Sequence, residues 1–116
     1  MDLLRVEPEE TPGAFRLEGE LDISNVEAVR TRLGEALGQV GQLTLDTRGI
    51  SFMDAQGLRM LILLGKQAQE QDATVRILDC SPQVRLLLEV TVPHGIPGVE
   101  IVNTGRTGSK GGPRGC

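Results

Sequence analysis

The residues of this 116-residue chain that are best placed to do chemistry lie in SFMDAQGLRMLI, residues 51–62. Asp54 stands directly before an apolar run of helical period, so its carboxylate can accept hydrogen bonds from the backbone amides of Gln56 or Gly57. A glycine in the first turn of a helix costs about 0.5–1 kcal/mol relative to alanine, so Gly57 indicates that a neighbouring loop or a partner protein approaches the backbone closely. The stretch therefore predicts a capped helix start, which is either purely structural or a docking point.

Polar side chains near this stretch and near an earlier helix start are further candidates. Asp22 precedes the first predicted helix, where it would serve either in partner binding or as a cap or turn residue ahead of Ser24. Arg59 is predicted to be exposed because it is a charge within the apolar run LRMLILL, with a plain solvated surface as the alternative to a contact. Met60 could add an adaptable exposed contact, although a core position is favoured.

Nothing in the sequence gathers the groups that catalysis needs. His94 is the only histidine, and it stands in a PHGIP turn without a second catalytic group to act with. No cluster of His and Cys has metal-ligand spacing, and no glycine-rich segment leads into Lys-Ser or Lys-Thr at the spacing of a phosphate-binding loop. We therefore expect no enzyme activity, no cofactor and no metal site.

Composition and charge indicate one acidic domain. Hydrophobic residues make up 39% of the sequence and only Phe15 and Phe52 are aromatic, so the core must consist of aliphatic side chains. Residues 1–104 carry nine bases and sixteen acids, a net charge of −7, whereas residues 105–116 carry three bases and no acid. An acidic body repels nucleic acid, and we expect residues 1–104 to form the domain and the Gly-rich basic tail at 105–116 to be disordered.

The sequence also predicts where the protein works. No stretch reaches the roughly eighteen apolar residues of a bilayer span, so we expect no membrane insertion. The first ten residues contain four acids and no apolar segment of signal-peptide length, which favours the cytoplasm. Cys80 and Cys116 lack metal-ligand spacing, and we expect no structural disulfide in that compartment.

The first half of the chain predicts a hairpin followed by a helix. DLLRV and AFRLEG, joined by a turn-rich segment, have the apolar pattern of two paired strands. Apolar residues at helical spacing from Val26 to Val40 predict the first helix. Ser24 and Glu27 match a capping box at its start, in which the hydroxyl accepts from a backbone amide and the carboxylate reaches back.

The second half predicts alternating strands and helices. These elements are, in order, a strand at 42–48, a second helix ending near residue 71, a strand at 73–80, a third helix from Pro82 with Ser81 as N-cap, and a strand at 98–102. Gly49 is predicted to form a turn after the first of these strands, and Asp46 to cap that turn. Crossover helices join parallel strands, so we predict an α/β fold with a mixed sheet of about five strands, three flanking helices and an opening hairpin.

Four stretches resemble the STAS domain of bacterial anti-sigma-factor antagonists: RLEGELD, ISFMDAQGL, VRILDCSP and VRLLLEV. The resemblance covers about residues 14–102 and includes both an early GELD and a later F-M-D-x-x-G-L. It implies a domain that binds a kinase-type anti-sigma factor when unphosphorylated and releases this partner when a serine is phosphorylated. In the family that serine directly follows the aspartate of the second motif.

This chain departs from the family pattern at the switch itself. Ala55 occupies the position of the phosphoacceptor, and Gln56 occupies the next one, which is often Ser or Thr in the family. A phosphoserine would add about −1.5 to −2 charge at a helix start, and alanine has no hydroxyl to accept it. We therefore predict a partner-facing helix start without the usual switch, with modification of Ser51 or Thr47 as an open alternative. The terminal helix usual in the family is also not predicted here, since residues after 102 have no helical period.

Two functions remain open after this comparison. The first is a regulatory adaptor that binds an anti-sigma factor or a related serine-kinase-like protein. The second is an accessory or scaffold STAS domain that binds a transporter ATPase, a multi-STAS complex or a small ligand. The residues predicted to bind the partner are Asp22, Ser24, Asp54, Ala55, Gln56, Gly57 and Arg59.

Overall fold

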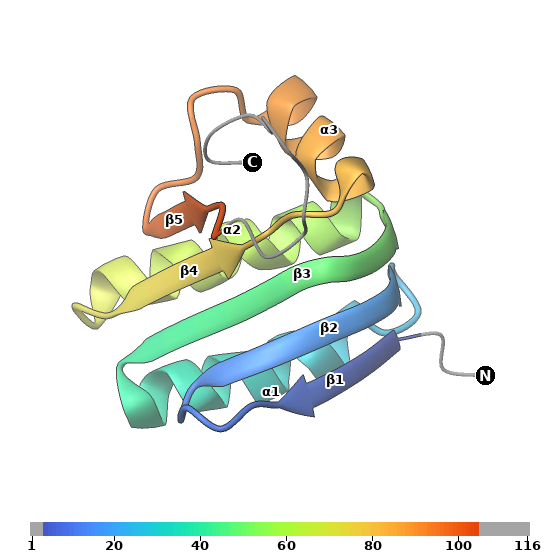
Figure 1. Cartoon of the computed structure of the whole chain (residues 1–116). Helices are drawn as coiled ribbons and strands as arrows, with labels where there is room; N and C mark the ends of the chain where they lie inside the picture. Colours follow the sequence, from blue (N-terminus) through green and yellow to red (C-terminus); the bar gives the residue numbers. More distant parts are fainter. Residues whose placement is uncertain (1–3, 105–116) are drawn as a thin grey trace.

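The computed structural model describes residues 4–104 (Figure 1). Its elements are, in chain order, β1 (Leu4–Pro8), β2 (Ala14–Leu21), α1 (Val26–Val40), β3 (Gln42–Met53), α2 (Ala55–Glu70), β4 (Thr74–Leu78), α3 (Pro82–Thr91) and β5 (Val99–Val102). The predicted tail at 105–116 lies outside the described residues. Within residues 4–104, no helix combines the length and apolar character that crossing a membrane requires.

The strands form one five-stranded sheet in the order β1-β2-β3-β4-β5. β1 and β2 pair antiparallel as a hairpin, and every later neighbouring pair is parallel. A helix follows each of β2, β3 and β4 and returns the chain to the opposite end of the sheet (Figure 1). The predicted mixed sheet with an opening hairpin and three helices is confirmed.

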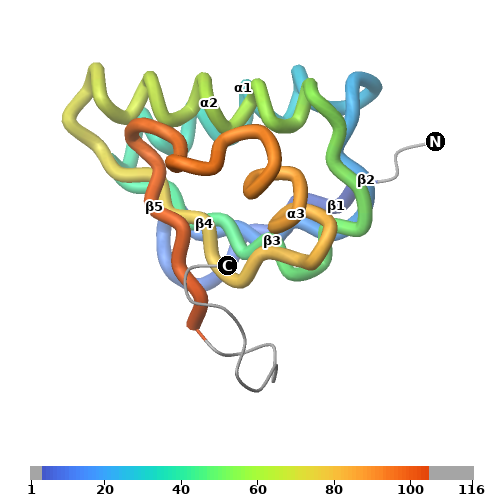
Figure 2. The backbone as a smooth tube through the Cα atoms, turned by 90° about the horizontal axis from the view of Figure 1, so that it is seen from above, coloured from blue at the N-terminus to red at the C-terminus, as the bar shows by residue number. Residues whose placement is uncertain are grey.

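The core lies between the sheet and two helices that run side by side on one of its faces (Figure 2). Its largest fully buried side chains are aliphatic, with Leu17, Leu45, Leu33 and Leu61 among them. Phe15 is the one buried aromatic side chain in the described residues. The aliphatic core expected from the composition is therefore present, and its apolar area supplies most of the stabilisation.

β3 is longer than predicted, because no turn forms at Gly49. The strand stays paired with β2 as far as Met53, with register shifts between Arg16 and Glu18 and between Gly19 and Glu20. A Cβ atom at Gly49 would lie 2.7 Å from Glu18 Cγ and 3.1 Å from Leu17 O, so this glycine permits close approach of the two strands. Asp46, predicted to cap the turn, lies inside β3 with a buried side chain that accepts hydrogen bonds from the backbone and guanidinium of Arg48, each at 3.1 Å.

The start of α1 also differs from the predicted capping box. Asn25 is the N-cap, and no side chain caps the helix there. The amide and the hydroxyl of Ser24 instead donate to Oδ1 of Asp22. Ser24 also lies one residue before the N-cap, so its hydroxyl does not cap the helix. Because the helix begins at Val26, Glu27 occupies the second helical position and pairs with Arg30 at 2.7 Å.

Cys80 follows β4 and is half-buried beside the core. It is disulfide-bonded, so the expectation of no structural disulfide is wrong in this structure. The sequence contains one other cysteine, Cys116, which lies outside the described residues.

α2 is held against the rest of the domain by a close backbone contact at Gly65. A Cβ atom added there would lie 2.3 Å from Pro97 O and 2.9 Å from Val99 Cγ2. Gly98, in the same loop and at φ +84°, also lies against Gly65, since a Cβ atom added to Gly98 would lie 2.1 Å from Gly65 O. The loop between α3 and β5 thus presses directly on the helix backbone.

We predict that Gly65→Ala lowers the free energy of unfolding by about 1–3 kcal/mol, because backbone atoms of the loop must move to admit the methyl group. Gly38→Ala is the matched control. Gly38 is an exposed glycine of α1 whose added Cβ would come no closer than 4.0 Å to Gln67 Nε2, so this substitution should stabilise by about 0.5–1 kcal/mol. Urea unfolding followed by circular dichroism measures both, and equal effects of the two substitutions would contradict the close contact.

Candidate functional site

The candidate site lies where two parallel strands end and the helices that follow them begin. β2 ends at Leu21 and β3 ends at Met53, and these two residues are paired in the sheet. The amide of Asp54 donates to Leu21 O at 3.3 Å, which holds the two strand ends together. The starts of α1 and α2 are therefore neighbours, and the carboxyl edge of parallel strands is where α/β sheets commonly bind ligands.

Asp54 caps α2 as the sequence predicts. Its backbone is extended, and Oδ1 accepts from the amides of Gln56 at 2.9 Å and Gly57 at 3.1 Å. The carboxylate also lies at the positive end of the helix dipole. Ala55 and Gln56 are exposed directly beyond this cap, so the helix start presents them to solvent in a fixed backbone geometry.

Gly57 is buried against the strand ends. A Cβ atom there would lie 2.6 Å from Met53 Cγ and 3.2 Å from Leu21 Cδ2. Of the two explanations for a glycine in the first turn, a neighbouring segment of the chain is the one present in the structure. Gly57 thus supports the site from beneath and allows α2 to start close to the sheet.

The turn between β2 and α1 forms a second corner of the site. Oδ1 of Asp22 accepts from the Ser24 amide at 2.9 Å and from its hydroxyl. Asn25 donates from Nδ2 to Glu20 O at 2.8 Å, and its Oδ1 accepts from the Asp22 amide at 3.2 Å. Asp22 therefore acts as the turn residue that the sequence offered as one of its two roles, while Ser24 is exposed at the tip.

A shallow groove of about 50 Å³ runs between the first turns of α1 and α2. Arg59 is exposed beside it and Met60 is only 1% exposed beneath it, so both positions agree with the favoured predictions. The groove brings the two helix starts into one continuous surface. The residues that line it are Val26, Glu27, Arg30, Gln56, Arg59, Met60 and Leu63.

Two exposed apolar side chains at this edge were not among the predicted site residues. Ile23, in the turn after β2, is 74% exposed, and Phe52, next to the end of β3, is 48% exposed. The composition showed only that Phe52 is one of two aromatic residues and did not predict where it lies. The alternation of side chains along a strand could have predicted its exposure. Met53 is buried, so the neighbouring side chain of Phe52 points to the other face of the sheet.

The hydroxyl groups near the site differ in accessibility. Thr47 is fully buried and donates to Leu78 O at 3.3 Å, whereas Ser51 is exposed and donates to Gly19 O at 3.2 Å. The folded protein therefore presents Ser51 to solvent and conceals Thr47. Ala55 itself offers only a methyl group.

The described residues were compared with the arrangement that a metal site needs. Residues 4–104 contain no group of three His, Cys, Asp or Glu side chains arranged to hold a metal ion. A hollow of about 470 Å³ lies at the β1–β2 turn, on the far end of the hairpin from the helix starts. Its lining is acidic, with Glu7, Glu9 and Glu10 facing Arg16.

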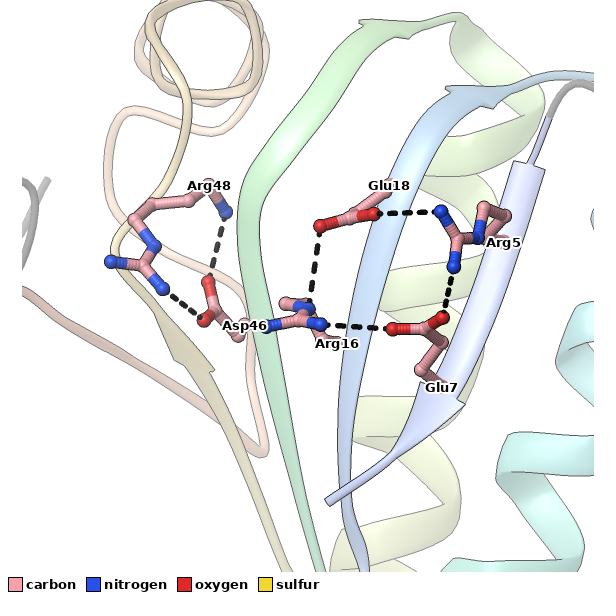
Figure 3. Close-up of polar contacts among 6 residues, drawn as sticks. All are labelled: Arg5, Glu7, Arg16, Glu18, Asp46 and Arg48. Carbon is pink, nitrogen blue, oxygen red and sulfur yellow. Dashed lines mark hydrogen bonds and ion pairs between the residues drawn. The ribbon is translucent and has the colours of Figure 1, made fainter.

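The sheet face turned away from α1 and α2 carries charged side chains from adjacent strands (Figure 3). Arg16 donates to Glu7 at 2.9 Å and lies 3.3 Å from Glu18, and Arg5 contacts both acids. The hydrogen bond from Arg16, followed by the charge of Arg5, holds the pKa of Glu7 below its usual range. Because these side chains keep 34–70% of their surface exposed, water screens the ion pairs and the cluster contributes little stability.

The fold and the site together define a small α/β domain with an exposed, capped helix start at the edge of its sheet. A model of the STAS domain matches residues 5–102. This match covers most of the chain, which therefore belongs to the STAS-domain family.

Known proteins of this family are similar in sequence and in fold. An anti-sigma F factor antagonist from Paenibacillus polymyxa is 29% identical over 92 residues, covering 76% of this chain and 79% of that protein. The Bacillus cell fate determinant SpoIIAA in its phosphorylated form superposes with a TM-score of 0.64 at 21% identity, over 87% of this chain and 90% of that one. An anti-sigma factor antagonist from Mycobacterium paratuberculosis gives 0.61 at 18% identity, over 83% and 82%. The two structures share the fold.

We predict that Asp54→Ala lowers the free energy of unfolding by about 1 kcal/mol, because the amides of Gln56 and Gly57 lose their acceptor. Asp54→Asn, which keeps an oxygen that can accept, should lose only a small part of this. Thermal and urea unfolding measure both variants. An Asp54→Ala variant as stable as the unmodified protein would show that the cap does not hold the helix start.

Proposed function

We propose that this protein is a non-enzymatic, cytoplasmic regulator of transcription that binds an anti-sigma factor or a related kinase-type protein. The observation that carries the proposal is the exposed start of α2, where the Asp54 cap presents Ala55 and Gln56 to solvent. A relative 29% identical to this chain is named an anti-sigma F factor antagonist, which supports the same partner class.

In this proposal the residues of the site divide into contacts and supports. The contacts are exposed: Ser24, Ala55, Gln56 and Arg59, with half-exposed Asp22 beside them. Asp54 and buried Gly57 hold the backbone from which these side chains project. Ile23 and Phe52 add apolar area at the same edge, which is the kind of side chain that dominates the energy of protein interfaces.

We further propose that the domain stays competent to bind, because position 55 cannot be phosphorylated. A phosphate at this helix start would add about −1.5 to −2 charge within the contact. The methyl group of Ala55 leaves the surface apolar at that point. The net charge of −7 over residues 1–104 also favours a partner with a basic face, whose approach such a charge accelerates.

We predict that affinity capture from the native cytoplasm with this protein as bait recovers a kinase-type anti-sigma factor. Gln56→Arg should weaken that complex at least tenfold in titration calorimetry, because a longer charged side chain intrudes at the centre of the contact. Gln42→Arg is the matched control, since Gln42 is exposed at the opposite end of β3. Equal affinity of the Gln56→Arg variant and the unmodified protein would place the interface elsewhere.

We also predict that Ala55→Ser restores a phosphoacceptor. Incubated with the captured kinase-type partner and ATP, the variant should gain one phosphate within residues 51–57, while the unmodified protein gains none there. Mass spectrometry of proteolytic peptides reads both results. Phosphate on Ser51 of the unmodified protein would mean that the switch has moved to that residue and has not been lost.

A further inference from the structure

α3 exposes two large apolar side chains one turn apart. Leu86 is 62% exposed and Val90 is 70% exposed, and their separation of four residues places them on one stripe of the helix. Val84 and Leu88, on another side of the helix, are buried in the core. α3 is therefore apolar on two sides, of which the fold covers only one.

No other element among residues 4–104 covers the stripe. Both residues remain exposed in the presence of every other described element. The segment after residue 104 reads GRTGSKGGPRGC and contains no Leu, Ile, Val, Met or Phe. Within the described residues both side chains therefore lack apolar neighbours on their outer side, and a second molecule would supply them.

The charges beside the stripe favour a second copy of this chain. Arg85 precedes Leu86 and Glu89 precedes Val90, so one basic and one acidic residue lie one turn apart along the same flank. Within residues 4–104 neither side chain takes part in an ion pair. When two such helices pack antiparallel about a two-fold axis, Arg85 of each copy faces Glu89 of the other, and the flank is complementary to itself.

We propose that α3 is a self-association surface, through which two copies pair antiparallel around Leu86 and Val90 with reciprocal contacts between Arg85 and Glu89. The helix has ten residues, so the contact is much smaller than the roughly 1,200 Å² of a stable interface. The dimer is accordingly weak and reversible. The surface does not include the start of α2, so this inference stands or falls independently of the proposed function.

Sedimentation equilibrium of the full chain tests the apolar part of the interface. The average mass should rise from monomer toward dimer as the concentration approaches about 1 mM. Leu86→Glu should weaken the association at least tenfold. Ile62→Glu, which changes a 41%-exposed apolar residue of α2, is the control and should leave association unchanged. Since both positions are exposed, thermal unfolding should confirm that the variants remain folded.

A charge exchange tests the antiparallel geometry. Arg85→Glu alone and Glu89→Arg alone should each weaken the dimer about tenfold, because attraction at two symmetric contacts becomes repulsion. The double variant, Arg85→Glu with Glu89→Arg, should regain the original association. A monomer at all concentrations, a dimer indifferent to Leu86→Glu, or a double variant no stronger than the single ones would overturn the proposal.

Discussion

The close packing of α2 on its neighbours is the contact on which the rest of the structure depends. Two glycines eight residues apart, Gly57 and Gly65, lie on the buried side of this helix. The first lets the helix touch the ends of β2 and β3, and the second admits the backbone of the loop before β5. These two contacts hold α2 against core and backbone atoms in one position. The start of the helix, from Asp54 to Gln56, is therefore fixed as well.

The length of β3 determines which side chains surround that segment. β3 extends well beyond its last pairing with β4, at Asp46 and Leu78. α3 contacts the overhanging half of β3, and Ser81, its N-cap, donates its amide to Thr47 O at 3.3 Å. The same overhang brings the end of β3 level with the end of β2. The adjacent helix starts thus follow from the length of β3, which has 12 residues where β4 beside it has five.

Local signals in the sequence were sufficient for most of the fold and for the centre of the site. The Asp54 cap depends on residues within three positions of one another, and it was predicted correctly. The errors arose where distant contacts decide the outcome. Gly49 has the local character of a turn, yet its conformation is set by Glu18 across the sheet. Ser24 has the local character of a cap, yet Asp22 engages its hydroxyl first. The exposure of Phe52 likewise depends on which face of the sheet the helices cover, and that is a property of the whole fold.

The ionic cluster on the opening hairpin has a consequence for how copies of this protein can meet. An outer strand with unpaired amides and carbonyls is a template for continuous strand-to-strand growth between molecules. Here β1 carries Arg5 and Glu7 and ends in Pro8, and the other outer strand, β5, has only four residues. The charges and the proline of β1 and the short length of β5 therefore disfavour edge-to-edge strand pairing between molecules at both edges of the sheet. The helix pairing proposed for α3 differs in kind, because two copies related by a two-fold axis form a closed dimer and leave no free edge for a third.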